Sequence, residues 1–147
     1  MHLNHIAILT HDFESSLQRF SAIFGKDPDF CDRNVVEDQG GEDEQAQKSA
    51  GWGFGPLSIW VVEPIGPGSL QRTLEKRGEG FTHLGFEVGE SEDFDKLMET
   101  WKANNVEVLA PYKKPHKRGE KGRYTFVDPK FAGNILMEFE HNGHVFA

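Results

Sequence analysis

Hydrophobic and polar residues alternate imperfectly along residues 3–9, but the pattern still favours a strand with two different faces. His5 and Ala7 share one face of this strand, while Ile6 and Ile8 share the other. We infer that a helix covers the Ile6 and Ile8 face, because an amphipathic segment follows at once in the chain. The face that carries His5 is then left for another contact.

The segment after this strand is predicted to be a helix. Its apolar residues recur at helical spacing: Phe13, Leu17, Phe20 and Phe24. Asp12 is the type of residue that caps a helix N-terminus, and Gly25 is typical of a helix end. Three strands are predicted to follow, at residues 31–36, 45–52 and 57–63. A short helix that ends near Gly78 completes the first half.

The same order then recurs in the second half of the chain. Residues 81–88 predict a strand with His83 and Gly85 on one face, and Ser91 is predicted to cap the next helix. The last three strands are predicted at residues 106–109, 123–127 and 134–140. The sequence therefore predicts a single α+β domain over residues 1–147, with βαβββ modules at 1–65 and 80–147 and a linker helix at 66–79.

The two modules share a register. His5 and His83 are 78 positions apart (83 − 5), and Trp60 and Glu138 are also 78 apart (138 − 60). Two copies of one unit related by a rough two-fold would bring these four positions around one centre. A unit this short buries its own sheet poorly, so we expect the two modules to pair.

His5, His83 and Glu138 are candidate metal ligands. Glu138 interrupts an apolar stretch, where a buried carboxylate is costly unless it is paired or bound to a metal. Two imidazoles and one carboxylate suit a divalent first-row metal. A single strand histidine is usually a hydrogen-bonded polar residue, and Glu138 alone could face solvent, as we expect of Glu140. The matching repeat positions favour joint ligation.

The formal net charge of −8 argues against a nucleic-acid partner. Six basic residues nevertheless crowd into one segment: Lys113, Lys114, Lys117, Arg118, Lys121 and Arg123. This segment is either a solvated hairpin or a positive rim that attracts an anionic small molecule, with Lys117, Arg118 and Arg123 as its substrate-binding residues.

The single cysteine, Cys31, excludes an internal disulfide and fits a reducing cytoplasm. Residues 1–9 lack the basic start and long apolar run of a signal peptide. No apolar stretch approaches the roughly 20 residues that cross a bilayer. We expect a cytoplasmic protein with no membrane partner.

These features resemble the vicinal oxygen chelate superfamily, which includes glyoxalase I, methylmalonyl-CoA epimerase, extradiol dioxygenases and bleomycin-resistance proteins. The resemblance covers nearly the whole chain and is strongest to the epimerase and lactoylglutathione lyase branch. It is carried by residues 5–8 (HIAI), 63–66 (EPIG), 74–88 (LEKRGEGFTHLGFEV), 126–129 (FVDP) and 133–138 (GNILME). It implies that the two βαβββ modules pair into an open eight-stranded barrel around one cavity, and that the protein forms a homodimer.

By position, the resemblance makes His5, His83 and Glu138 three of the family's metal ligands, for a divalent ion such as Zn, Co, Ni, Mn or Fe. The fourth ligand, normally Gln or Glu, falls at Trp60, whose indole offers no lone pair to a metal. Trp60 is either a core aromatic or a flat surface on which a planar ligand stacks. The acid that acts as the epimerase base falls at Asp43, in a turn that is otherwise a solvated acidic loop.

Three functions remain open from the sequence. The first is a lyase or isomerase of the glyoxalase or epimerase type, in which the metal and Glu138 stabilise an enolate of a carbonyl or thioester substrate and Asp43 moves the proton. The second is an extradiol-type dioxygenase with non-haem iron. The third is a non-catalytic protein that binds an aromatic molecule or drug, with Trp60 as its platform.

Overall fold

The computed structural model describes residues 1–37, 45–118 and 121–141. The chain divides into two compact units. The N-terminal unit is His5–Thr82, and the C-terminal unit combines Met1–Asn4 with His83–Ala147. Asp43 falls outside the described residues, so the predicted base has no structural account.

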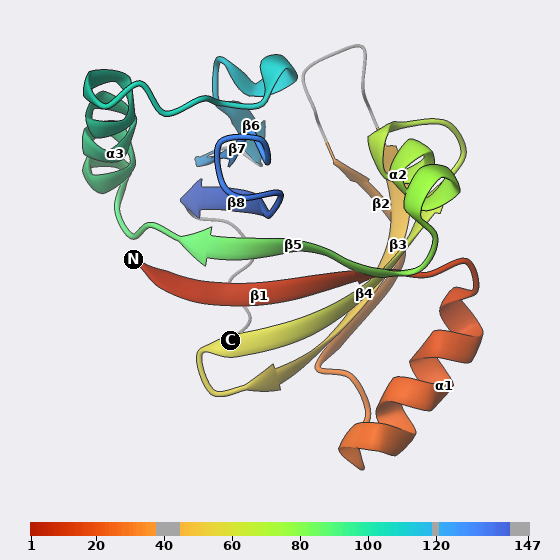
Figure 1. Ribbon diagram of the computed structural model, residues 1–147. Helices are drawn as coiled ribbons and strands as arrows, with labels where there is room; N and C mark the ends of the chain where they lie inside the picture. Colours follow the sequence, from red (N-terminus) through yellow and green to blue (C-terminus); the bar gives the residue numbers. More distant parts are fainter. Residues whose placement is uncertain (38–44, 119–120, 142–147) are drawn as a thin grey trace. The chain divides into compact units, whose positions relative to one another are not determined.

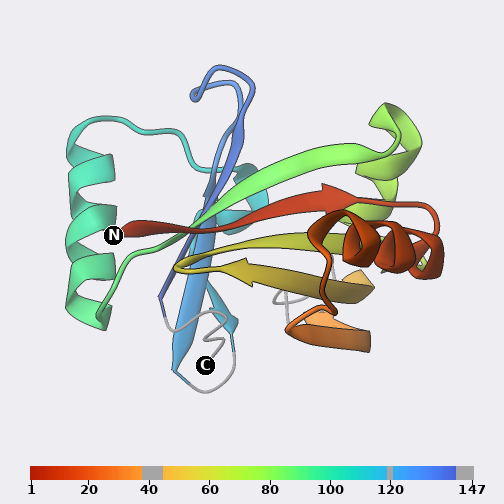
Figure 2. The same cartoon turned by 90° about the horizontal axis from the view of Figure 1, so that it is seen from below.

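The N-terminal unit follows the predicted order of one strand, one helix, three strands and a short helix. Its elements are β1 (His2–Leu9, which begins in the other unit), α1 (Phe13–Phe24), β2 (Phe30–Glu37), β3 (Gln45–Phe54), β4 (Leu57–Ile65) and α2 (Ser69–Arg77). The strands are ordered β2-β3-β4-β1 (Figures 1 and 2). β1 is parallel to β4, and the other neighbouring pairs are antiparallel.

Helix α1 has the predicted ends. Asp12 accepts a hydrogen bond from the backbone N–H of Ser15 at 3.0 Å, and Gly25 closes the helix at φ 67°, a conformation that costs glycine little. The apolar face of α1 then packs on one face of the sheet. Its cluster consists of Phe13, Ala50, Trp52 and Val61, with Leu17, Phe20 and Phe24 against it.

Helix α2 lies against the opposite face of the same sheet. Its Leu74 packs with Leu9, Trp60 and Val62, and Trp60 and Val62 point away from Val61 because strand residues alternate between faces. The two faces of this sheet are therefore both partly covered. The face that carries His5, Ala7 and Leu9 is the one that meets α2.

The C-terminal unit repeats the plan. Its elements are β5 (Gly80–Glu87, which begins in the other unit), α3 (Ser91–Ala103), the 3-10 turn η1 (Ala110–Tyr112), β6 (His116–Arg118), β7 (Gly122–Val127) and β8 (Leu136–His141). The strands are ordered β5-β8-β7-β6, and β5 is parallel to β8. Helix α3 packs on the unit through Phe94 and Trp101, which join Val88, Val127 and Phe139 in one cluster.

Parallel pairing is identical in the two halves. β1 places His5 beside Ser58 and Ala7 beside Trp60, while β5 places His83 beside Leu136 and Gly85 beside Glu138. Each of these second-half residues is 78 positions after its first-half counterpart, for example 136 − 58 and 85 − 7. The predicted register of the repeat is confirmed in the strand pairing.

Three sequence-based expectations are wrong. Residues 106–109 contribute only the single bridge between Val108 and Val127, because the chain turns into η1 at Pro111, which lacks the N–H that a strand needs. The first of the last three strands is instead β6, inside the basic segment. The N-cap of α3 is Glu90, not Ser91: Glu90 and Asp93 form a capping box, and the Ser91 hydroxyl accepts a hydrogen bond from Arg123.

The third error concerns Glu140, which was expected to face solvent. Its side chain is fully buried, with 0% of its surface exposed. Glu140 lies two residues after Glu138 on β8, so both carboxylates share a face of this strand.

The described residues contain no helix that is long and apolar enough to span a bilayer.

Candidate functional site

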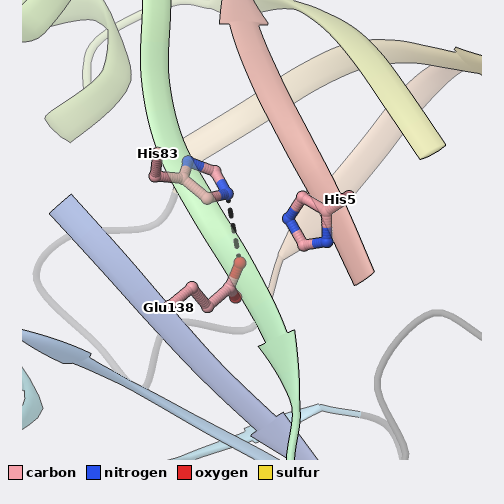
Figure 3. Close-up of side chains that lie close together, drawn as sticks. All are labelled: His5, His83 and Glu138. Carbon is pink, nitrogen blue, oxygen red and sulfur yellow. Dashed lines mark ion pairs between the residues drawn. The ribbon is translucent and has the colours of Figure 1, made fainter. Parts of the chain in front are cut away.

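The side chains of Glu138 and His83 contact each other in the C-terminal unit. The Nε2 atom of His83 on β5 lies 3.1 Å from Oε2 of Glu138 on β8 (Figure 3). The Glu138 side chain is 3% exposed and that of His83 is 13% exposed. Because a buried carboxylate is costly without a partner, the sequence-based expectation of a paired Glu138 agrees with this geometry.

The parallel pairing of β5 and β8 explains why these two side chains meet. Glu138 stands beside Gly85, and Gly85 is two residues after His83 on the same face of β5. Gly85 has no side chain to fill the space beside the carboxylate. On the other side of β8, Phe126 stands beside Glu138, and its ring meets the His83 imidazole edge-on with centroids 5.8 Å apart.

His5 is held differently, in the N-terminal unit. Its side chain is fully buried, and its imidazole stacks on the indole of Trp60, with centroids 4.0 Å apart and planes 7° from parallel. Trp60 Nε1–H donates a hydrogen bond to Ser58 Oγ at 2.7 Å, and Ser58 is the strand partner of His5. Figure 3 draws His5 on its strand together with His83 and Glu138.

Trp60 is buried, as its predicted inward position requires, with 5% of its surface exposed. One face of its indole lies against His5, and the edge of Phe30 meets it at 5.3 Å between centroids. The sequence did not single out Ser58 or Phe30. Ser58 and Trp60 are two positions apart on β4 and share a face, so the period-two pattern of this strand could have identified Ser58.

The three basic residues expected to bind substrate differ in their surroundings. Lys117 is exposed on β6, and the Arg118 side chain lies outside the described part of the structure. Arg123 is bound to α3: its guanidinium contacts Asp95 Oδ1 at 2.7 Å and the Ser91 hydroxyl at 2.9 Å. The hydrogen bond from Arg123 lowers the pKa of Asp95 below its usual range.

The family model described as "Glyoxalase/Bleomycin resistance protein/Dioxygenase superfamily" matches residues 4–126. Mitochondrial methylmalonyl-CoA epimerase of Dictyostelium discoideum is 26% identical over 140 residues, which cover 94% of this chain and 76% of that protein.

Solved structures of methylmalonyl-CoA epimerases share the fold. A variant of the Streptomyces coelicolor enzyme, in complex with 2-nitronate-propionyl-CoA, superposes with a TM-score of 0.74 at 25% identity, over 98% of this chain and 99% of that one. The Mycobacterium tuberculosis enzyme gives a TM-score of 0.74 at 19% identity, over 97% and 88% of the two chains.

The structural likeness confirms the expected α+β fold of the vicinal oxygen chelate type. The family model spans most of the chain, including His5 and His83, and the three relatives described above are methylmalonyl-CoA epimerases. The chain belongs to the glyoxalase/bleomycin resistance protein/dioxygenase superfamily.

Proposed function

We propose that this protein is a metal-dependent epimerase that acts on a carboxyacyl-CoA thioester of the methylmalonyl-CoA class. The observation that carries the proposal is the buried His83–Glu138 pair, whose positions recur in the first half of the chain as His5 and Trp60. The relatives support the substrate class, since an epimerase of known structure is bound to a CoA thioester analogue.

We infer that His5, His83 and Glu138 together hold a divalent ion, for which Zn, Co, Ni, Mn and Fe are the candidates. All three belong to the residue types that bind such ions. The donor chemistry fits: the Glu138 carboxylate is nine-tenths buried or more and lies against the imidazole of His83. The equivalent strand positions of His5 and His83 support the inclusion of His5.

When bound, the metal would polarise the thioester carbonyl and stabilise the enolate charge that develops as the α-proton leaves. Glu138 supplies the negative charge that keeps a cation among neutral imidazoles. Asp43 is the candidate for the group that accepts the α-proton and allows its return from solvent to the other face of the carbon. This assignment rests on the family resemblance, because Asp43 lies outside the described residues.

The basic segment is the candidate site for the phosphates of the CoA portion. Lys117 is exposed and available to an anion, whereas Arg123 would first have to leave Asp95 and Ser91. We therefore assign phosphate binding to Lys117 and Arg118 and give Arg123 the role of holding β7 on α3. Replacing Lys117 and Arg118 by Ala should raise KM for a CoA thioester without changing kcat.

Exchange of the substrate's α-proton tests the proposed function. Methylmalonyl-CoA is incubated in D2O with protein loaded with Co²⁺, and deuterium at C2 is followed by NMR. We expect incorporation with loaded protein and none with protein stripped by EDTA or carrying Glu138→Gln. The exposed Glu99→Gln is the matched control and should exchange at the wild-type rate. If loaded wild-type protein exchanges no deuterium, the proposal is wrong.

A further inference from the structure

Trp60 stands at the position of the repeat that Glu138 fills in the second half. Trp60 is paired with Ala7 on β1, and Glu138 is paired with Gly85 on β5, 78 residues later in both strands. Because the pairing is the same, the two side chains leave their sheets at equivalent places and on equivalent faces. An indole therefore takes the place of a carboxylate in the first half.

The indole plane is fixed by three contacts in the N-terminal unit. His5 stacks on one face at 4.0 Å between centroids, the indole N–H donates to Ser58 at 2.7 Å, and Phe30 meets the ring edge-on. Gly51, the strand partner of Trp60, leaves the room for this arrangement: a Cβ there would lie 2.9 Å from Trp60 Cδ1 and closer still to the Phe30 ring.

These contacts also restrict the His5 imidazole. Ring planes 7° from parallel leave the imidazole one orientation about its Cβ–Cγ axis, apart from a half-turn. His5 and Ser58 are neighbours across the β1–β4 pair, so the same two strands fix both the histidine and the hydroxyl that holds the indole. A metal-ligating side chain that is already oriented loses less conformational entropy when the metal binds.

We propose that Trp60 is a positioning residue for the metal centre: it orients the His5 imidazole and stands where a fourth ligand would be, so that the ion has three protein donors. This inference rests on the proposed metal site. Since an indole offers no lone pair, the remaining coordination positions fall to water or substrate. Trp60 thus acts on His5 and does not serve as a platform for a planar ligand.

Binding of Co²⁺, followed by its visible absorption, tests this role without an activity assay. Trp60→Leu removes the stack, and we expect the Co²⁺ affinity to fall about tenfold, as for other changes to residues that orient a ligand. Trp60→Phe keeps a ring against His5 and should stay within about threefold of wild type. Trp60→Glu adds a carboxylate, so we expect about tenfold tighter binding and weaker visible absorption, as the coordination number rises.

Trp52→Leu is the matched control, because Trp52 is a buried indole of the same unit that packs against α1 on the other face of the sheet. It should lower the melting temperature and leave Co²⁺ affinity unchanged. Equal affinity in wild type, Trp60→Leu and Trp60→Glu would overturn the inference while leaving the metal site intact. If wild-type protein binds no Co²⁺, the proposed function itself fails. Should Trp60→Leu not fold, the near-wild-type affinity expected of Trp60→Phe and the tighter binding expected of Trp60→Glu decide the question.

Discussion

At the scale of single residues, the proposed metal site depends most on Glu138, its one anionic ligand. A carboxylate that is 3% exposed is costly to bury unless polar or charged partners compensate it, and the His83 imidazole at 3.1 Å is one such partner. Glu140, two residues later on the same face of β8, is also buried, although the sequence did not predict its burial. A polar residue two positions away from a candidate ligand on the same strand therefore indicates that this face of the strand meets a polar interior.

Glu138→Gln should lower the metal affinity of the protein while leaving its fold intact. The amide keeps the volume of the side chain but is a poor ligand, so we expect Co²⁺ affinity to fall about a hundredfold. In metal-free protein the melting temperature should change by only a few degrees, because the variant removes the buried charge while its amide can still form a hydrogen bond with the His83 imidazole. Thermal unfolding with and without Co²⁺ measures both effects. A variant still stabilised by Co²⁺ as strongly as wild type would remove Glu138 from the ligand set.

At the scale of elements, the start of α2 is capped from another strand. Its N-cap residue is Gly68, which has no side chain, and Gln45 on β3 takes over this role. The Gln45 Oε1 atom accepts a hydrogen bond from the backbone N–H of Gln71 at 3.1 Å, and its amide nitrogen donates to the Ala46 carbonyl at 3.0 Å. A Cβ at Gly68 would collide with the Gln45 side chain, so the two residues require each other.

Gln45→Ala should therefore destabilise the protein by about 2–3 kcal/mol, since a fully buried amide and its hydrogen bonds are lost. Gln47→Ala is the matched control on the same strand and face: Gln47 is 8% exposed and has no side-chain hydrogen bond within the described part of the chain. The loss of stability in Gln47→Ala should be about 1 kcal/mol. Urea unfolding of both variants gives the comparison, and equal losses would contradict the capping role.

At the scale of the whole molecule, the repeat explains what could be read from the sequence. The spacing of 78 was visible because β1–β4 and β5–β8 pair in the same register, and helix α1 was visible because Asp12 and Gly25 mark its ends. The pairing of Arg123 with Asp95 was not visible, since it joins residues 28 positions apart through long side chains. The strand predicted at 106–109 does not form because the chain enters the turn η1 at Pro111 directly after it.

We propose that His5, His83 and Glu138 are ligands of one divalent ion. The most direct measurement is a crystal structure of Co²⁺-loaded protein, with data collected at the cobalt absorption edge. The account predicts one strong anomalous peak, about 2.0–2.2 Å from a nitrogen of each histidine and from a carboxylate oxygen of Glu138. No peak at these side chains, or a peak bound elsewhere, would contradict it.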